Sequence, residues 1–176
     1  EGANNFKAIA INSQRTESTP AELIAEYKPV VVQPKPSVPD IQLYVLVVGI
    51  NQYKNPKYNL NYALADALAF SESLSNGTTS LFSKVNTTVL KDADATKDGI
   101  AKAFEQIKAT ARPQDLLVFY YAGHGVVNDK KEFFLVPHDV TQLYGADDAL
   151  AQKGFSAAAL QQLSKDIKAQ KQLFIL

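Results

Sequence analysis

The chain has 176 residues, of which 46% are apolar and 20% charged, enough for a globular domain with a buried core. Eighteen basic residues balance eighteen acidic ones, which excludes a broad basic face for nucleic acid and argues against a polybasic membrane anchor. No apolar run reaches the ~18 residues of a membrane-spanning helix. The absence of Cys excludes a disulfide framework, a thiolate metal site and a cysteine nucleophile within these residues.

The first forty residues differ from the rest. A short strand is predicted at residues 6–11, and prolines then punctuate residues 28–40 and favour an extended chain. We interpret residues 1–40 as an N-terminal arm and proline-rich linker before a domain at residues 41–176. An arm packed on the edge of that domain is the alternative.

From residue 41 onward, apolar runs alternate with amphipathic segments. Residues 43–50 (LYVLVVGI) and 115–121 (DLLVFYY) are continuous apolar runs, which are typical of strands buried on both faces. Shorter strands are predicted at residues 87–90, 133–136 and 172–176. Thr96 and Ser156 are expected to cap two helices, and Asn76-Gly77 to end an earlier one at residues 60–74.

The helices are expected to present apolar stripes to a sheet. This order predicts an α/β fold with a mainly parallel sheet and helices on both faces. The side chains expected to face inward are Leu60, Leu64, Ala67, Leu68 and Leu74 in the first helix, Ile100, Ala103, Phe104, Ile107 and Ala111 in the second, and Leu160, Leu163 and Ile167 in the third.

The most informative segment is Gly123-His124-Gly125, directly after a buried strand. Ligands of parallel sheets bind at the carboxyl ends of the strands, and glycines permit a tight turn. An imidazole held there can titrate near neutral pH. A loop histidine with turn glycines is the alternative from these residues alone. No glycine-rich phosphate-binding motif occurs, so a nucleotide site has little support.

The segment FYYAGHG resembles the histidine motif of the caspase-like cysteine peptidases, which include caspases, metacaspases and bacterial relatives. Further segments resemble that family in the same order: LYVLVVGINQY, LNYALADA, VLKDADATKDGI, FFLVPHDV and KQLFIL. The resemblance implies a caspase–haemoglobinase-like three-layer sandwich, of which residues 41–176 would be the large-subunit-type part and therefore incomplete.

The resemblance also implies a cysteine endopeptidase with a Cys–His dyad. His124 would be its general base and acid, and the backbone amide of Gly125 or its neighbour would donate to the oxyanion. Asp66 falls on the Asp of an Asn-Asp-Ala pattern, although Ala65 replaces the Asn. That Asp implies an acidic pocket that prefers Arg or Lys at the P1 position of a substrate. A solvated helix Asp is the alternative.

The family's nucleophile lies roughly 50 residues after its histidine. Leu176 lies about that far beyond His124, so we expect the Cys just after Leu176 in a longer protein, with both ends of this chain being cuts. The fragment would carry the His without the Cys and be inactive alone. Its partners would be a peptide substrate and the remaining C-terminal part of the domain, in the same or a separate chain.

Two other functions stay open at this point. One is a catalytically inactive caspase-like interaction or regulatory module, and the other is an unrelated flavodoxin-like ligand-binding domain. Neither nucleic acid nor a membrane is an expected partner.

No resident cofactor or metal is expected. Calcium is the one ion the resemblance admits, because some metacaspases depend on it, and acidic loops would have to bind it. We expect these loops to be solvated turns; their carboxylates are Asp92, Asp94, Asp147 and Asp148. His138 is interpreted as a structural or surface residue, and Lys130-Lys131 as an exposed turn, with a processing site as the alternative.

Overall fold

The computed structural model of the chain describes residues 3–26, 40–145 and 147–176. The chain forms two compact units, residues 1–37 and residues 38–176, which are described separately. No helix among the described residues has both the length and the apolar character needed to cross a membrane.

The first unit contains an antiparallel hairpin of β1 (Ala3–Ala8) and β2 (Ala21–Glu26). The predicted strand at residues 6–11 therefore begins earlier than expected, and its partner strand was not predicted. The side chains of both strands are exposed. Residues 28–39 of the predicted linker lie outside the described residues.

The second unit is built on a four-stranded sheet in which every neighbouring pair is parallel. The strand order is β4-β3-β5-β9. This arrangement confirms the predicted parallel sheet, although the strand predicted at residues 87–90 is longer. The strands are β3 (Gln42–Gly49), β4 (Lys84–Lys91), β5 (Leu116–Ala122) and β9 (Lys171–Ile175).

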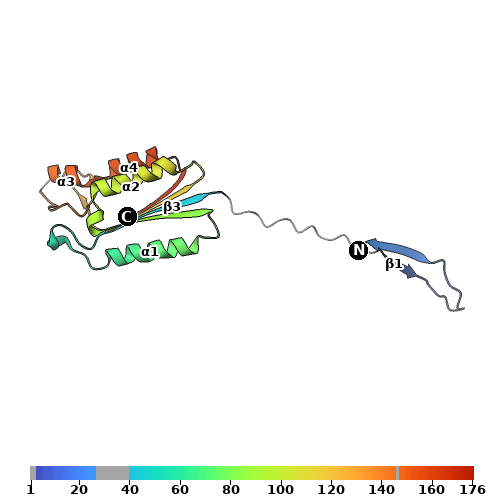
Figure 1. Cartoon of the computed structure of the whole chain (residues 1–176). Coiled ribbons are helices and arrows are strands. Elements are labelled where there is room, and N and C mark those ends of the chain that lie inside the picture. Colours follow the sequence, from blue (N-terminus) through green and yellow to red (C-terminus); the bar gives the residue numbers. More distant parts are fainter. Residues whose placement is uncertain (1–2, 27–39, 146) are drawn as a thin grey trace. The chain divides into compact units, whose positions relative to one another are not determined.

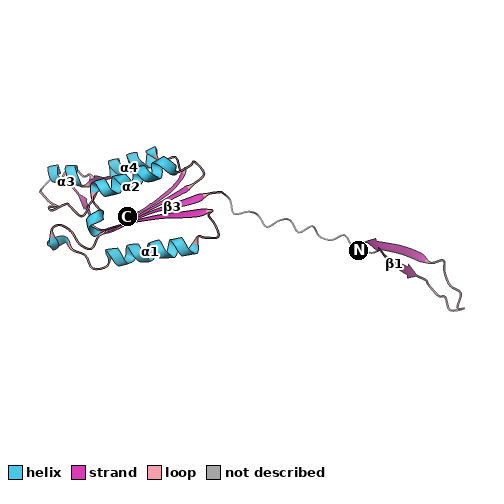
Figure 2. Cartoon of the chain, viewed as in Figure 1, coloured by secondary structure: helices cyan, strands magenta, loops and turns pink. Residues whose placement is uncertain are grey.

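Helices cover both faces of this sheet, as Figures 1 and 2 show. Helix α1 (Ala63–Gly77) lies on one face, while α2 (Lys97–Thr110) and α4 (Ala157–Asp166) lie on the other. The two predicted N-caps are confirmed: Thr96 accepts a hydrogen bond from the Gly99 amide at 3.0 Å, and Ser156 accepts one from the Ala159 amide at 3.1 Å.

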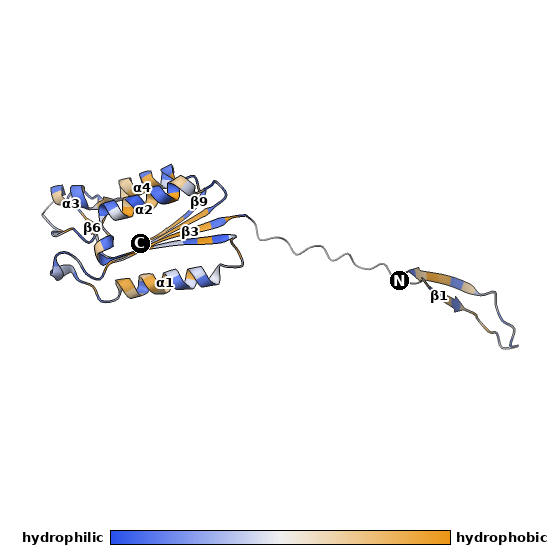
Figure 3. Ribbon diagram, viewed as in Figure 1, coloured by the Kyte–Doolittle hydropathy of each residue, from blue (hydrophilic) through white to orange (hydrophobic). Residues whose placement is uncertain are grey.

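The core lies on the two faces of the sheet. β3 is composed mainly of apolar residues (Figure 3). Its central position explains this composition, because alternate side chains enter opposite layers. All five residues of the predicted stripe on α2 are buried. Of β3, the layer beneath α1 contains Leu43, Val45 and Val47, and the layer beneath α2 and α4 contains Tyr44, Leu46 and Val48.

The predicted inner face of α1 needs a correction. Leu68 is 40% exposed, and the buried positions of the helix are Ala67 and Ser71. A Cβ added at Gly49 would lie 2.7 Å from the Cβ of Ala67. Helix and strand therefore approach so closely that small residues occupy the contact. Leu68 is the next residue round the helix from Ala67 and lies outside that contact.

A smaller antiparallel sheet follows β5. It comprises β6 (Gly125–Val127), β7 (Phe133–Leu135) and β8 (Phe155–Ser156). Between β7 and β8 the chain forms α3 (Asp147–Lys153), which was not predicted. Asp147 and Asp148 were expected in a loop but form the first turn of α3, where a negative charge is favourable.

Candidate active site

The site is built around the turn that joins β5 to β6. β5 ends at Ala122 and β6 begins at Gly125, so Gly123 and His124 form the whole connection. A Cβ at residue 123 would lie 2.8 Å from the hydroxyl oxygens of both Tyr53 and Tyr121. The two hydroxyls approach the backbone too closely for a side chain at residue 123, so glycine suits this position. The next residue, His124, lies at the carboxyl edge of the sheet.

The imidazole of His124 is held by a backbone carbonyl. Its Nε2 lies 2.8 Å from the carbonyl oxygen of Tyr58. A carbonyl can only accept, so Nε2 carries the proton and donates it to Tyr58. In the neutral ring the lone pair then resides on Nδ1, which has no hydrogen-bond partner among the described residues. The geometry thus prepares Nδ1 to accept a proton.

Two tyrosine rings surround the imidazole. The ring centroids of Tyr53 and His124 are 5.1 Å apart and tilted by 46°, while Tyr58 meets the imidazole edge-on at 6.2 Å. The hydroxyl of Tyr53 also accepts a hydrogen bond from the backbone amide of His124 at 2.8 Å. Tyr53 therefore contacts both the ring and the main chain of the histidine.

A second buried tyrosine holds the same turn from β5. The hydroxyl of Tyr121 donates to the carbonyl oxygen of Val136 at 2.7 Å. Burial raises the pKa of Tyr53, and burial raises the pKa of Tyr121 well above its ordinary value. Both hydroxyls therefore stay neutral near pH 7 and act as hydrogen-bonding groups.

The loop that carries Tyr53 and Tyr58 is anchored by Asp92. One carboxylate oxygen of Asp92 accepts hydrogen bonds from the amides of Asn51 and Gln52, each at 2.8 Å. Asp92 has φ 40°, in the left-handed region that a non-glycine residue rarely adopts. The expectation of a solvated turn is corrected for Asp92, because one of its carboxylate oxygens binds the backbone of this loop.

His138 anchors the same loop from the other side. Its Nδ1 lies 2.7 Å from the carbonyl oxygen of Gln52, and its own carbonyl accepts from the amide of Lys54 at 2.9 Å. The carbonyl again requires a proton on the contacting nitrogen, here Nδ1. The two histidines of the chain therefore adopt opposite tautomers, and the role of His138 is structural.

The predicted site residues are placed at the same edge but do not all meet. Ala67, which follows Asp66, packs against Gly49 at the carboxyl end of β3. Asp66 itself is exposed in the first turn of α1 and forms no hydrogen bond to His124. Gly125 is also exposed and pairs with Leu135 in the β6–β7 ladder; its proposed oxyanion role stays a prediction.

The described residues contain no cluster of three or more His, Asp or Glu side chains suited to a metal ion. Asp94 belongs to the short 3-10 turn at residues 92–94 and is exposed. Lys130 and Lys131 are exposed in the turn between β6 and β7, as predicted.

Sequence reasoning missed the residues that hold His124. Tyr58 contributes its backbone carbonyl, and any residue type at this position could supply the same group. Tyr53 is an aromatic residue in an otherwise polar loop after a core strand, and this position alone does not indicate a contact with the histidine. Asp92 adjoins a strand end, where a carboxylate suits a backbone-binding turn as well as a metal.

Together these features define an α/β protein with a histidine at the carboxyl edge of its sheet, whose Nδ1 has no hydrogen-bond partner among the described residues. The sequence pattern of the caspase domain, peptidase family C14, matches residues 42–176. The chain therefore belongs to the caspase-domain family, whose members are caspase-like cysteine peptidases.

Other comparisons bear on the fold. The crystal structure of protein GSU0716 from Geobacter sulfurreducens is similar with a TM-score of 0.56 and 19% sequence identity. The similarity covers 76% of this chain and 48% of the Geobacter protein. This chain therefore spans about half the length of the Geobacter protein. A search of curated proteins found no match.

Proposed function

We propose that this chain supplies the histidine of a Cys–His endopeptidase and that His124 is the general base and acid. The observation that carries the proposal is the Nε2 contact to the Tyr58 carbonyl at 2.8 Å, which leaves Nδ1 as the proton acceptor. Because the sequence has no Cys, the nucleophile must come from outside these 176 residues. Alone, the chain is expected to be inactive.

The reaction follows from these positions. Nδ1 accepts the proton of the cysteine thiol, and the thiolate sulfur forms a bond to the scissile carbonyl carbon. The resulting imidazolium still donates from Nε2 to the carbonyl of Tyr58. Nδ1 then returns its proton to the leaving amine as the C–N bond breaks. Water later cleaves the thioester by the same proton route.

The sheet register supports a nucleophile beside β9. β9 and β5 are parallel neighbours in which Ile175 pairs with Tyr120, and neighbouring strands are about 4.8 Å apart. A residue that continues the direction of β9 would thus reach the edge where His124 sits. We propose that the Cys follows β9 in the intact protein.

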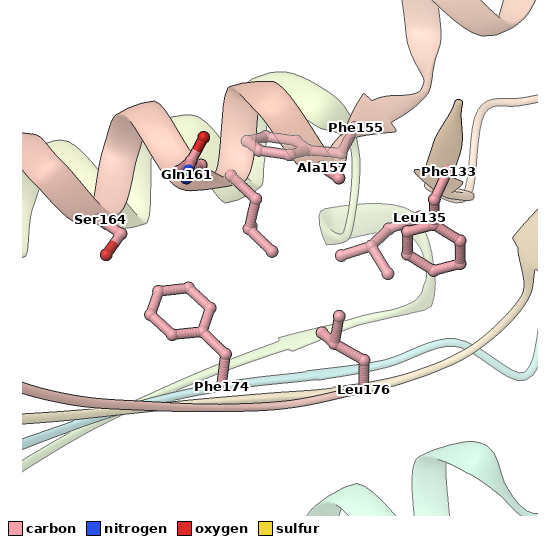
Figure 4. A pocket seen from close by; sticks show the side chains of 9 residues that line it. Phe133, Leu135, Phe155, Ala157, Gln161, Ser164, Phe174 and Leu176 are labelled. Atoms are coloured by element: carbon pink, nitrogen blue, oxygen red, sulfur yellow. The ribbon is translucent and has the colours of Figure 1, made fainter. Parts of the chain in front are cut away.

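The free edge of β9 supports a further partner. Among the described residues β9 pairs only with β5, and an apolar pocket of about 230 Å³ lies between β9, α4 and β7 (Figure 4). Phe174 and Leu176 form its floor. We propose that the remaining part of the caspase-like domain, in the same or a separate chain, pairs with β9 and covers this pocket.

For the substrate, we propose a peptide with Arg or Lys at P1, recognised by Asp66. The carboxylate is exposed at the carboxyl edge of the sheet, and a basic side chain would form a charge-assisted pair with it. No resident metal is required. The expected result with EDTA is unchanged activity; loss of activity restored by calcium would add a cofactor to this proposal.

The test uses the intact protein with peptides that carry Arg, Lys or Asp at P1. We expect cleavage after Arg and Lys, and loss of cleavage in His124→Ala. Asp66→Asn should raise KM for basic peptides at least about tenfold, since a charged hydrogen-bond partner is lost. Asp98→Asn is the matched control, because Asp98 is an exposed acid in the first turn of α2. Cleavage only after Asp would refute the role of Asp66.

The absence of Cys also favours one alternative function, a catalytically inactive interaction or regulatory module. Mass spectrometry of the intact protein separates the two possibilities by identifying the residues after Leu176. A Cys there supports the peptidase, whereas an intact protein without one would leave the family assignment in place and favour the interaction module.

A further inference from the structure

We propose that Tyr53 is a positioning residue for His124 and fixes the tautomer on which the proposed dyad depends. The inference rests on the proposed function for its consequence in catalysis, but its structural content concerns this chain alone. Tyr53 contacts the histidine twice, through its hydroxyl at the His124 amide and through its ring at the imidazole.

The hydroxyl fixes the backbone at His124. It is a buried acceptor 2.8 Å from the amide of a residue 71 positions away in the sequence. The amide has no ladder partner because it lies in the connection between β5 and β6. Removal of the acceptor would leave the donor without a partner in a half-buried turn, which is unfavourable.

The ring limits how the imidazole can turn. Tyr53 lies 5.1 Å from it in a tilted arrangement, and Tyr58 meets it edge-on. With the rings on two sides, the Nε2 contact to the Tyr58 carbonyl fixes the remaining orientation. Tyr53 and Tyr58 belong to one loop. The Tyr53 hydroxyl and ring and the Tyr58 carbonyl, which together hold His124, therefore move as one group.

The anchors of that loop support a preorganised arrangement. The amide of Tyr53 donates to the side-chain oxygen of Asn59 at 2.8 Å, and the amides of Asn51 and Gln52 both donate to Asp92. Tyr53 is thus fixed independently of His124. A residue held in this way can determine the orientation of the histidine rather than follow it.

The test is NMR of the 176-residue chain with ¹⁵N-labelled histidine. The chain has only two histidines, so each imidazole can be followed separately. In the wild type we expect His124 protonated at Nε2, His138 protonated at Nδ1, and a slowly exchanging His124 amide. In Tyr53→Phe we expect that amide to exchange about tenfold faster, as loss of one hydrogen bond implies. In Tyr53→Leu, which also removes the ring contact, we expect His124 to become a mixture of tautomers.

Tyr62→Phe is the matched control because Tyr62 is exposed near the same loop and should leave both histidines unchanged. His138 is an internal reference within Tyr53→Phe. An unchanged His124 in Tyr53→Phe overturns the proposal, and so does an equal change at both histidines, which would signify general loosening. A rapidly exchanging His124 amide in the wild type overturns it without any variant. None of these results depends on peptidase activity.

Discussion

Replacing Asp115 with Asn should destabilise the α/β unit more than most single polar substitutions. Asp115 lies just before β5 and is fully buried. One carboxylate oxygen accepts from the Gln42 amide at 2.9 Å and from Arg112 Nη2 at 3.0 Å. The other accepts from the Arg112 amide at 2.8 Å and from its Nε at 3.1 Å.

The magnitude follows from these four bonds. Asn presents one oxygen and one NH₂ group, so in either orientation one backbone donor and one guanidinium donor lose their acceptor. Hydrogen bonds to charged groups contribute about 1.5–3 kcal/mol each, and the guanidinium of Arg112, which is partly exposed, can turn to water. We expect a loss of roughly 3 kcal/mol, or a decrease of about 10 °C in Tm.

Urea unfolding followed by circular dichroism measures this difference as a function of pH. Burial raises the pKa of Asp115, but its bonds to Arg112 and to the two amides outweigh burial, so its pKa lies below the ordinary value. The stabilisation is therefore complete above the unfolded pKa, near 3.9, and is lost as the pH falls through the lower folded pKa. The deficit of the variant should persist at pH 7 and 5 and shrink below about pH 4.

Asp40→Asn is the control, because Asp40 pairs with the same Arg112 but its side chain is 77% exposed. Water can replace its bonds, so its effect should be clearly smaller. Equal destabilisation by the two variants, or a deficit of Asp115→Asn that stays constant down to pH 2, would refute the reasoning from burial.

Three further predictions concern packing, capping and a buried hydroxyl, each checked by urea unfolding. Gly49→Ala should cost about 1–3 kcal/mol by overpacking, whereas Gly77→Ala, with open space around it, should be close to neutral; equal effects would contradict the contact argument. Thr96→Ala should cost about 1 kcal/mol through loss of an N-cap, and Thr96→Ser should recover most of it. Tyr121→Phe should cost about 1–3 kcal/mol because Val136 loses a buried donor; an unchanged stability would count against that bond.

The sheet and the second helix could be predicted because their sequence patterns have one dominant cause. β3 and β5 are central strands covered on both faces, so their residues are apolar without alternation. α2 rests one face on the sheet, and its apolar residues recur with helical spacing. In both cases burial alone determines the pattern, and no distant partner is needed to interpret it.

The inner face of α1 could not be predicted in the same way. Hydrophobicity favours Leu68 as an inward residue, but the position at the contact is decided by distance from the sheet. Gly49 allows the helix to approach so closely that Ala67 and Ser71 fill the space. The inward-facing residues of α1 thus depend on a residue of β3, and the sequence of the helix alone does not predict them.

In the candidate site, too, the sequence predicts features that depend on local residues and does not predict those that depend on remote contacts. The position of His124 follows from local sequence, since a buried strand, a glycine and a histidine in succession place an imidazole at the sheet edge. The groups that orient it are remote in sequence: the hydroxyl of Tyr53 is 71 residues away and the carbonyl of Tyr58 is 66 away. Such contacts arise only when the loop after β3 folds over the end of β5.

That loop gives the second histidine its place in the site. Asp92 binds the amides at the start of the loop and His138 binds the next carbonyl, so two side chains from separate segments fix the backbone that carries Tyr53 and Tyr58. The orientation of His124 therefore depends on a backbone that these two side chains hold in place.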